Sequence, residues 1–224
     1  FLTAVIVSFL FSSCNSDEQP VKKTTEDTTK KANADKNSVF KIPSPIELYI
    51  YMKDNGARFN KALLTNQDNA SKYVTTKNRA MNFGIYASDL AYCSVYGSSQ
   101  ETFVYFKSAK SLSDGLGLSE GFDDIVSKRL NNNMNNTDSL YEISNDAYDD
   151  ACSYLESEGK NDILSYILVG SWIESLYISI QSVNKFNPDD PIVIRIAEQQ
   201  LILENLNASL DKIKKDADFE DTKA

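Results

Sequence analysis

Asp89 is a candidate chemical group because the residues around it exclude water. Its neighbours at three and four residues, the spacing that brings side chains together on a helix, are Ile85, Tyr86, Tyr92 and Cys93. Such a setting raises the pKa of a carboxyl group by desolvation unless tyrosine hydroxyls bond to it. Asp89 is therefore a candidate general acid or ligand-orienting group. The sequence favours a plainer role, a structural carboxylate that ties a tyrosine hydroxyl inside a bundle.

Glu174 is the second candidate buried carboxylate. It lies on a narrow polar stripe with Ser171, Ser175 and Ser182, in a segment that is otherwise apolar. Two carboxyl groups that face one cleft are the minimum for glycoside hydrolysis. Because the sequence alone does not place Asp89 opposite Glu174, a carboxylate-based hydrolase is the second hypothesis, behind a non-catalytic binding module.

Other chemistries are limited by composition. The chain contains no histidine, which removes the commonest general base and metal ligand and excludes serine-triad and zinc-hydrolase chemistry. The acidic run 145–150 (NDAYDD) lacks the glycine and distant glutamate of a calcium loop, so a solvated helix face is expected there. A net charge of −9 without a basic stripe argues against nucleic acid as a partner. We expect no metal and no cofactor.

Two cysteines of the main domain, Cys93 and Cys152, are 59 residues apart. In an oxidising compartment they could form a disulfide. Cys93 lies on an apolar helical stripe, which favours buried free thiols over a bridge. Most of the 12 tyrosines also fall at helical spacings, and this favours aromatic packing over a sugar- or peptide-binding surface.

The N-terminal segment has the pattern of a secretory signal. Residues 1–11 (FLTAVIVSFLF) carry no charge and precede Ser12, Ser13 and Cys14, small residues that a signal peptidase accepts. The run is shorter than the roughly 20 apolar residues that a transmembrane helix needs. Because a basic region is expected before it, we expect a few residues to precede Phe1. The alternative is a free cysteine that merely ends an apolar segment.

The segment 10–14 (LFSSC) resembles the lipobox of bacterial lipoproteins. The resemblance implies that Cys14 carries lipid and becomes the mature N-terminus, with acyl chains as a durable membrane anchor. Asp17 and Glu18 resemble the acidic export signal of surface lipoproteins of Bacteroidota, although two charges in a solvated linker would look the same. Asn15 is not the aspartate of an inner-membrane retention signal. We expect outer-membrane anchoring, with the periplasmic or surface face left open.

Behind the signal, the chain divides into a polar stretch and a helical domain. Residues 15–40 are dominated by Lys, Thr, Asp, Glu and Asn, and large apolar residues first gather at Val39 and Phe40. Such a stretch buries too little surface to offset its chain entropy, which predicts a disordered tether. Residues 41–224 are the predicted domain.

Helix-start signals recur through this domain. We expect helices to begin at the capping box Ser44-Pro45-Ile46-Glu47, at Thr75 or Thr76, at Ser99, at Ser119, at Asn136 or Thr137, at Asn161 and near Asp190, with a short helix across 58–64 and a loop at 131–136. Connections of two to six residues favour antiparallel neighbours. No run alternates with period two. The predicted fold is all-α, a single antiparallel bundle of about six to eight helices.

Two predicted helices carry most of the packing information. The helix over 162–183 is apolar around most of its circumference, so it should be central. The last helix, 190–215, has a heptad seam of Ile192, Ile196, Gln199, Leu203, Leu206, Leu210 and Ile213, which is polar only at Gln199. Three heptads are short for an independent coiled coil. Packing back on the bundle is expected, and self-association is the alternative.

The segments 43–64, 72–118 and 167–182 resemble helical lipoproteins of Bacteroidota known mainly as hypothetical proteins. The resemblance covers about residues 44–183 and rests on helix-packing patterns. It implies an all-helical fold and an envelope location, and no activity. The sequence therefore predicts a membrane-anchored lipoprotein that binds an envelope protein or glycan. The alternative is a carboxylate hydrolase of envelope glycans or peptidoglycan.

Overall fold

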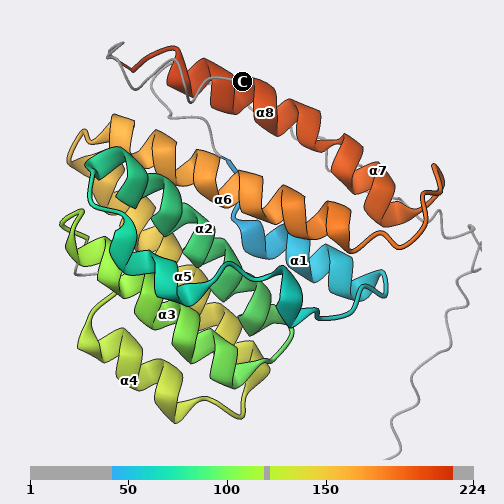
Figure 1. Ribbon diagram of the computed structural model, residues 1–224, viewed down its shortest axis with the longest axis horizontal. Coiled ribbons are helices and arrows are strands. Elements are labelled where there is room, and N and C mark those ends of the chain that lie inside the picture. The colour runs from blue at the N-terminus through green and yellow to red at the C-terminus, as the bar shows by residue number, and fades with distance from the viewer. Residues whose placement is uncertain (1–41, 119–121, 214–224) are drawn as a thin grey trace, which may run out of the picture. The chain divides into compact units, whose positions relative to one another are not determined.

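A computed structural model describes residues 42–118 and 122–213 (Figure 1). Their elements are α1 (Pro45–Asp54), η1 (Lys61–Leu63), η2 (Gln67–Lys72), α2 (Thr76–Val95), α3 (Ser99–Asp114), α4 (Asp124–Asn132), α5 (Thr137–Ser157), α6 (Asn161–Gln181), α7 (Pro191–Ala197) and α8 (Gln199–Leu210), where η marks a 3-10 helix. The described residues contain no strand. The predicted all-helical bundle is therefore confirmed. The predicted signal segment 1–14 and tether 15–40 lie outside the described residues.

Capping residues explain where most helices begin. The side chains of Ser44, Thr75 and Asn136 each accept a hydrogen bond from a backbone N–H of the first turn, as predicted. Asn161 was expected to cap α6, but it is the first residue of that helix, and Lys160 precedes it without a side-chain cap. The start expected at Ser119 lies outside the described residues, and α4 is instead capped by Asp123.

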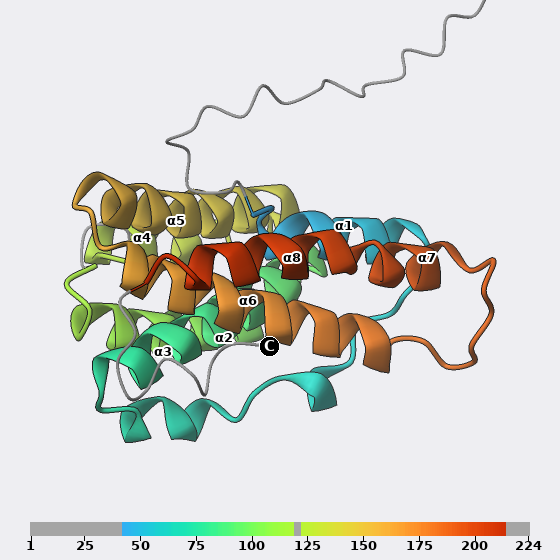
Figure 2. The ribbon, with the colours of Figure 1, turned by 90° about the horizontal axis from the view of Figure 1, so that it is seen from above.

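Two further boundaries differ from the predicted ones. The expected short helix across 58–64 is only the 3-10 turn η1. The expected final helix is divided at Glu198 into α7 and α8, and no single contact explains the break. The heptad seam nevertheless faces its own bundle, because Ile192, Leu206 and Leu210 are buried. Figure 2 shows α7 and α8 lying along α6.

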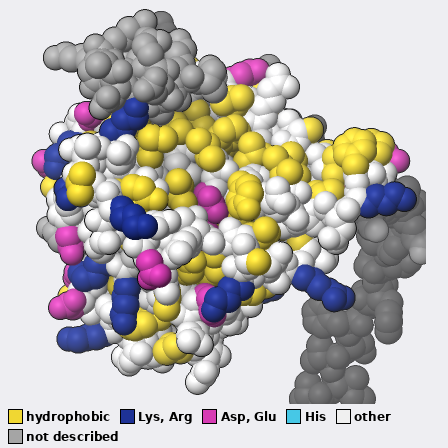
Figure 3. All heavy atoms as spheres, in the orientation of Figure 1, with side chains coloured by type: hydrophobic (Ala, Val, Ile, Leu, Met, Phe, Trp, Pro, Cys, Tyr) yellow, Lys and Arg dark blue, Asp and Glu magenta, His cyan; other side chains and the backbone are white. Residues whose placement is uncertain are grey.

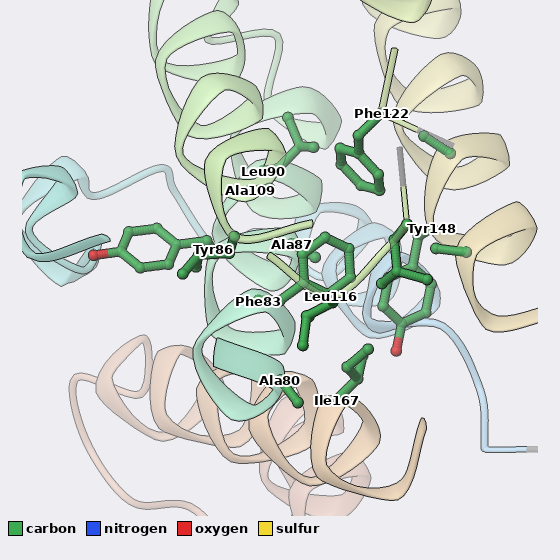
Figure 4. Close-up of a cluster of buried hydrophobic side chains, with 14 of the residues drawn as sticks. Ala80, Phe83, Tyr86, Ala87, Leu90, Ala109, Leu116, Phe122, Tyr148 and Ile167 are labelled. Atoms are coloured by element: carbon green, nitrogen blue, oxygen red, sulfur yellow. The ribbon is translucent and has the colours of Figure 1, made fainter. Parts of the chain in front are cut away.

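Helix α6 is central, as predicted, and contacts α1, α2, α5, α7 and α8. It is the one described helix whose length and hydropathy would suffice to cross a membrane, and 67% of its most apolar window is buried in the bundle. The core of a bundle accounts for that composition. Figure 4 shows Phe83 of α2 in the adjoining core with Phe122, Tyr148 and Ile167.

Helices α2 and α6 approach each other so closely that their backbones touch at two glycines. A Cβ atom added to Gly84 would lie 2.1 Å from the carbonyl oxygen of Ile167, and one added to Gly170 would lie 1.9 Å from that of Met81. Consecutive helices such as α2 and α3 run antiparallel, as expected, whereas α2 and α6 run in the same direction (Figure 1). Each glycine therefore lets one backbone rest directly on the other.

Replacing either glycine by alanine should destabilise the fold. In an open helix the change from glycine to alanine stabilises by up to about 1 kcal/mol. Here the added methyl group would overlap backbone that cannot move alone, so we expect Gly84→Ala and Gly170→Ala each to lower the free energy of unfolding by about 3 kcal/mol or more. Urea denaturation measures this.

Gly115→Ala is the matched control. The backbone φ of Gly115 is −75°, and an added Cβ would meet only the flexible side chain of Arg79. This variant should change stability by less than about 1 kcal/mol. Equal stability of all three variants would show that α2 and α6 are not in backbone contact.

Candidate functional site

The close contact of α2 and α6 places the two predicted carboxylates side by side. Asp89 lies five residues beyond Gly84 on α2, and Glu174 lies four residues beyond Gly170 on α6. Asp89 is 0% exposed and Glu174 is 8% exposed. The two carboxyl groups are close enough that each shifts the pKa of the other. The structure thus supplies the pairing that the sequence left open.

The pair has few other partners. The backbone N–H of Thr65 donates to Asp89 Oδ2 at 3.1 Å, and the side chain of Thr65 lowers the pKa of both carboxyl groups. Among the described residues, no donor reaches Asp89 Oδ1 or Glu174 Oε1. Two ionised carboxylates repel each other and cannot donate to each other, so their proximity favours a proton on one of them.

Burial favours retention of this proton. It raises the pKa of Glu174 to about 7. It also raises the pKa of Asp89 well above its usual range, and the nearby charge of Glu174 adds to this effect. Two buried carboxylates without a cation between them repel each other, which is why such pairs share a proton. At neutral pH the pair therefore carries at most about one negative charge.

Thr65 belongs to a segment, residues 55–75, that connects α1 to α2 and covers the pair; we call it the strap. Four tyrosine hydroxyls of α2 and α3 donate to strap carbonyls. They are Tyr96 to Ala57 at 3.1 Å, Tyr92 to Arg58 at 3.3 Å, Tyr105 to Thr65 at 2.5 Å and Tyr86 to Asn66 at 2.7 Å. The strap is thereby fixed along most of its length.

These bonds correct one expectation about Asp89. The neighbouring hydroxyls of Tyr86 and Tyr92 were expected to reach its carboxylate, and they instead bind the strap. Thr65 takes their place. Thr65 could not be identified from the sequence, because it lies 24 residues from Asp89 in irregular backbone and belongs to no motif.

The other predicted features occupy separate places. Cys93 is buried and Cys152 is half-buried, and both are free thiols, as expected. Asp146, Asp149 and Asp150 are exposed on α5, which confirms the predicted solvated face. Among the described residues, no three acidic or cysteine side chains converge as a metal site would require. Cys14 lies outside the described residues.

Three cavities open at the surface, and neither Asp89 nor Glu174 lines any of them. The first, of about 280 Å³, lies beside Trp172 and Arg195. The second, of about 670 Å³, runs along α5 past Glu47 and Asp149. The third, of about 550 Å³, lies between the start of the strap and the loop after α6. The carboxyl pair is therefore sealed from these spaces.

The chain matches no protein-family profile, no curated protein and no solved structure. Its function must be inferred from its own residues. What those residues show most clearly is a buried carboxyl pair with raised pKa values that is enclosed by two helices and a strap.

The pair makes stability depend on pH in a defined direction. Both folded-state pKa values are raised, so the stabilisation is fully present below the unfolded pKa values and is lost as pH rises. We expect the free energy of unfolding to fall between pH 4.5 and pH 7, by about 3 kcal/mol from Glu174 alone. Chemical denaturation at several pH values measures this fall.

The double variant Asp89→Asn/Glu174→Gln is the reference, because its amides keep the shape and hydrogen-bonding capacity without a titrating proton. The free energy of unfolding of the double variant should not fall in this way between pH 4.5 and pH 7. The difference in stability between the double variant and the native chain should therefore shift in favour of the variant as pH rises. Parallel pH profiles of the two proteins would contradict the shared proton.

Proposed function

We propose that this chain is a lipid-anchored protein of the bacterial cell envelope whose helical domain binds a partner without catalysing a reaction. The anchor rests on the sequence, where an apolar run and two small residues precede Cys14. Outer-membrane anchoring, with an envelope protein or glycan as partner, belongs to the same proposal. So does a relationship to the helical lipoproteins of Bacteroidota.

The sealed carboxyl pair carries the non-catalytic part of the proposal. A general acid must come within hydrogen-bond reach of its substrate. Asp89 accepts a hydrogen bond from the backbone of Thr65, the two carboxyl groups shift the pKa of each other, and neither lines any of the three cavities described above. Glycosidases hold their two carboxyl groups about 5 Å or more apart to admit the sugar. Asp89 and Glu174 are buried in the bundle, which leaves no room for a sugar beside them.

An exposed apolar stripe on α6 supports binding. Ile173, Tyr177 and Ile180 share one face of the helix and are 46%, 43% and 48% exposed. Tyr177 therefore lies at the surface of the domain and not in its core. Figure 3 shows hydrophobic side chains gathered over the upper half of the face that it draws. Contiguous exposed apolar surface is typical of interaction sites.

A carboxylate hydrolase of envelope glycans or peptidoglycan is the second candidate. One observation favours it: the pKa of Glu174 is raised to about 7, the value that suits a general acid at neutral pH. Under that hypothesis the strap would have to leave the pair. Its four tyrosine hydrogen bonds oppose such a movement.

Acylation of Cys14 is directly testable. In a lipoprotein-processing bacterium, we expect the native chain to incorporate a clickable fatty acid and to fractionate with membranes. Cys14→Ala should abolish the label, because the thiol is the acceptor of the lipid, and should leave the chain unprocessed or mislocalised. A Cys14→Ala chain that still labels and sediments with membranes would refute the anchor.

Catalysis and binding are separated by assaying the chain against peptidoglycan fragments and envelope glycans. We expect no turnover, and at most saturable binding that shifts the melting temperature. Asp89→Asn and Glu174→Gln should leave any such binding within about twofold. A hydrolytic activity that either variant lowers by about 10²-fold or more, without loss of the fold, would establish the hydrolase instead.

A further inference from the structure

The groove of about 670 Å³ along α5 has walls from three parts of the domain: residues 42–47, one face of α5 and the start of α6. We propose that this groove, here called the acidic groove, is occupied by residues 36–41 of the same chain. That segment reads KNSVFK and immediately precedes the first described residue, Ile42.

Charge is the first argument. Glu47, Asp149 and Glu156 line the acidic groove, and no lysine or arginine is among its lining residues. Asp149 is already affected by this imbalance: partial burial raises its pKa, and the charges of nearby acids add to the effect. The segment 36–41 contains two lysines and no acid. A net charge of +2 would thus meet three carboxylates along the groove.

Apolar complementarity is the second argument. Val39 and Phe40 are the first large apolar side chains to gather in a stretch that is otherwise polar. The acidic groove offers apolar wall from Ile46, Leu164 and Leu168. Burying Phe40 there would remove apolar surface from water at about 25 cal/mol per Å². In a linker that is exposed to water along its whole length, large apolar side chains at this point would contribute no burial.

The position of the chain is the third argument. Ile42, Pro43 and Ser44 themselves form part of the groove wall. Ser44 Oγ donates to Asn145 Oδ1 at 2.9 Å, which fixes the exit of the chain against α5. Residue 41 can therefore enter the groove without an intervening loop.

Length is the fourth argument. Six extended residues span about 20 Å. From Asn145 to Glu156, α5 rises about 16 Å. Residues 36–41 are therefore long enough to reach from Ile42 to the far end of the acidic groove. The docked segment would exclude other cations from the groove.

Disulfide trapping tests this arrangement. Cys152 is a free thiol that also lines the groove, so the mature chain carries Cys14→Ser and Cys152→Ser in all variants. Ser38→Cys is then paired with Ser153→Cys, because Ser153 is an exposed residue of the groove wall. The control pair is Thr25→Cys with Ser153→Cys, because Thr25 lies 13 residues before Ser38 and outside the segment proposed to dock. We expect the first pair to oxidise at least tenfold faster than the control under mild oxidant. Equal rates would overturn the proposal.

Charge neutralisation provides the second arm. Glu47→Gln/Asp149→Asn/Glu156→Gln should lower the trapping rate of the Ser38→Cys pair several-fold, whereas Glu204→Gln, an exposed acid on α8, should leave it unchanged. Pentalysine serves as the probe for a foreign cation. It should bind a chain that begins at Ile42 at least tenfold more tightly than the mature chain. Equal binding would show that the groove is open, and would overturn self-docking in favour of an external cationic ligand.

Discussion

The structure depends above all on the direct contact of two helix backbones, which Gly84 and Gly170 make possible. Each glycine lies where any larger residue would overlap a carbonyl of the facing helix. This contact fixes both the separation and the relative rotation of α2 and α6. Ser171, Glu174 and Ser175 consequently face inward and are buried, while Ile173, Tyr177 and Ile180 face outward. The usual distribution of polar and apolar residues on a helix is inverted along this stretch.

The inward polar groups are stable because each finds a partner close at hand. Ser171, Ser175 and Ser179 donate to carbonyls of their own helix. Asp89 and Glu174 instead lie close to each other, and burial raises the pKa of both, which favours a proton shared between them. Buried polar pairs of this kind favour one packing arrangement over others, since a shift of either helix would leave two carboxyl groups without a partner. The strap completes the enclosure through Thr65, and its tyrosine bonds hold it there.

Local features of the fold could be predicted from the sequence, and long-range ones could not. Ser44, Thr75 and Asn136 marked their helices because a cap acts within one turn. The apolar circumference of α6 placed it at the centre, and Asp89 and Glu174 were recognisable as buried carboxylates from their neighbours. Their pairing depends on two residues 85 positions apart and on a helix rotation that the glycines set. Gly84 and Gly170, small residues within apolar helices, were the signal that could have indicated it.

The central claim is that α2, α6 and the strap enclose a carboxyl pair that shares one proton. Carbon-13 NMR of the Asp89 and Glu174 carboxyl carbons, assigned with Asp89→Asn and Glu174→Gln and followed from pH 3 to pH 9, tests it most directly. We expect that neither carboxyl carbon titrates near pH 4 and that the pair loses its first proton near pH 7. The carbon resonances of Asp89 and Glu174 should move together at that pH. Two independent titrations near pH 4 would show solvated carboxylates and would contradict the enclosure.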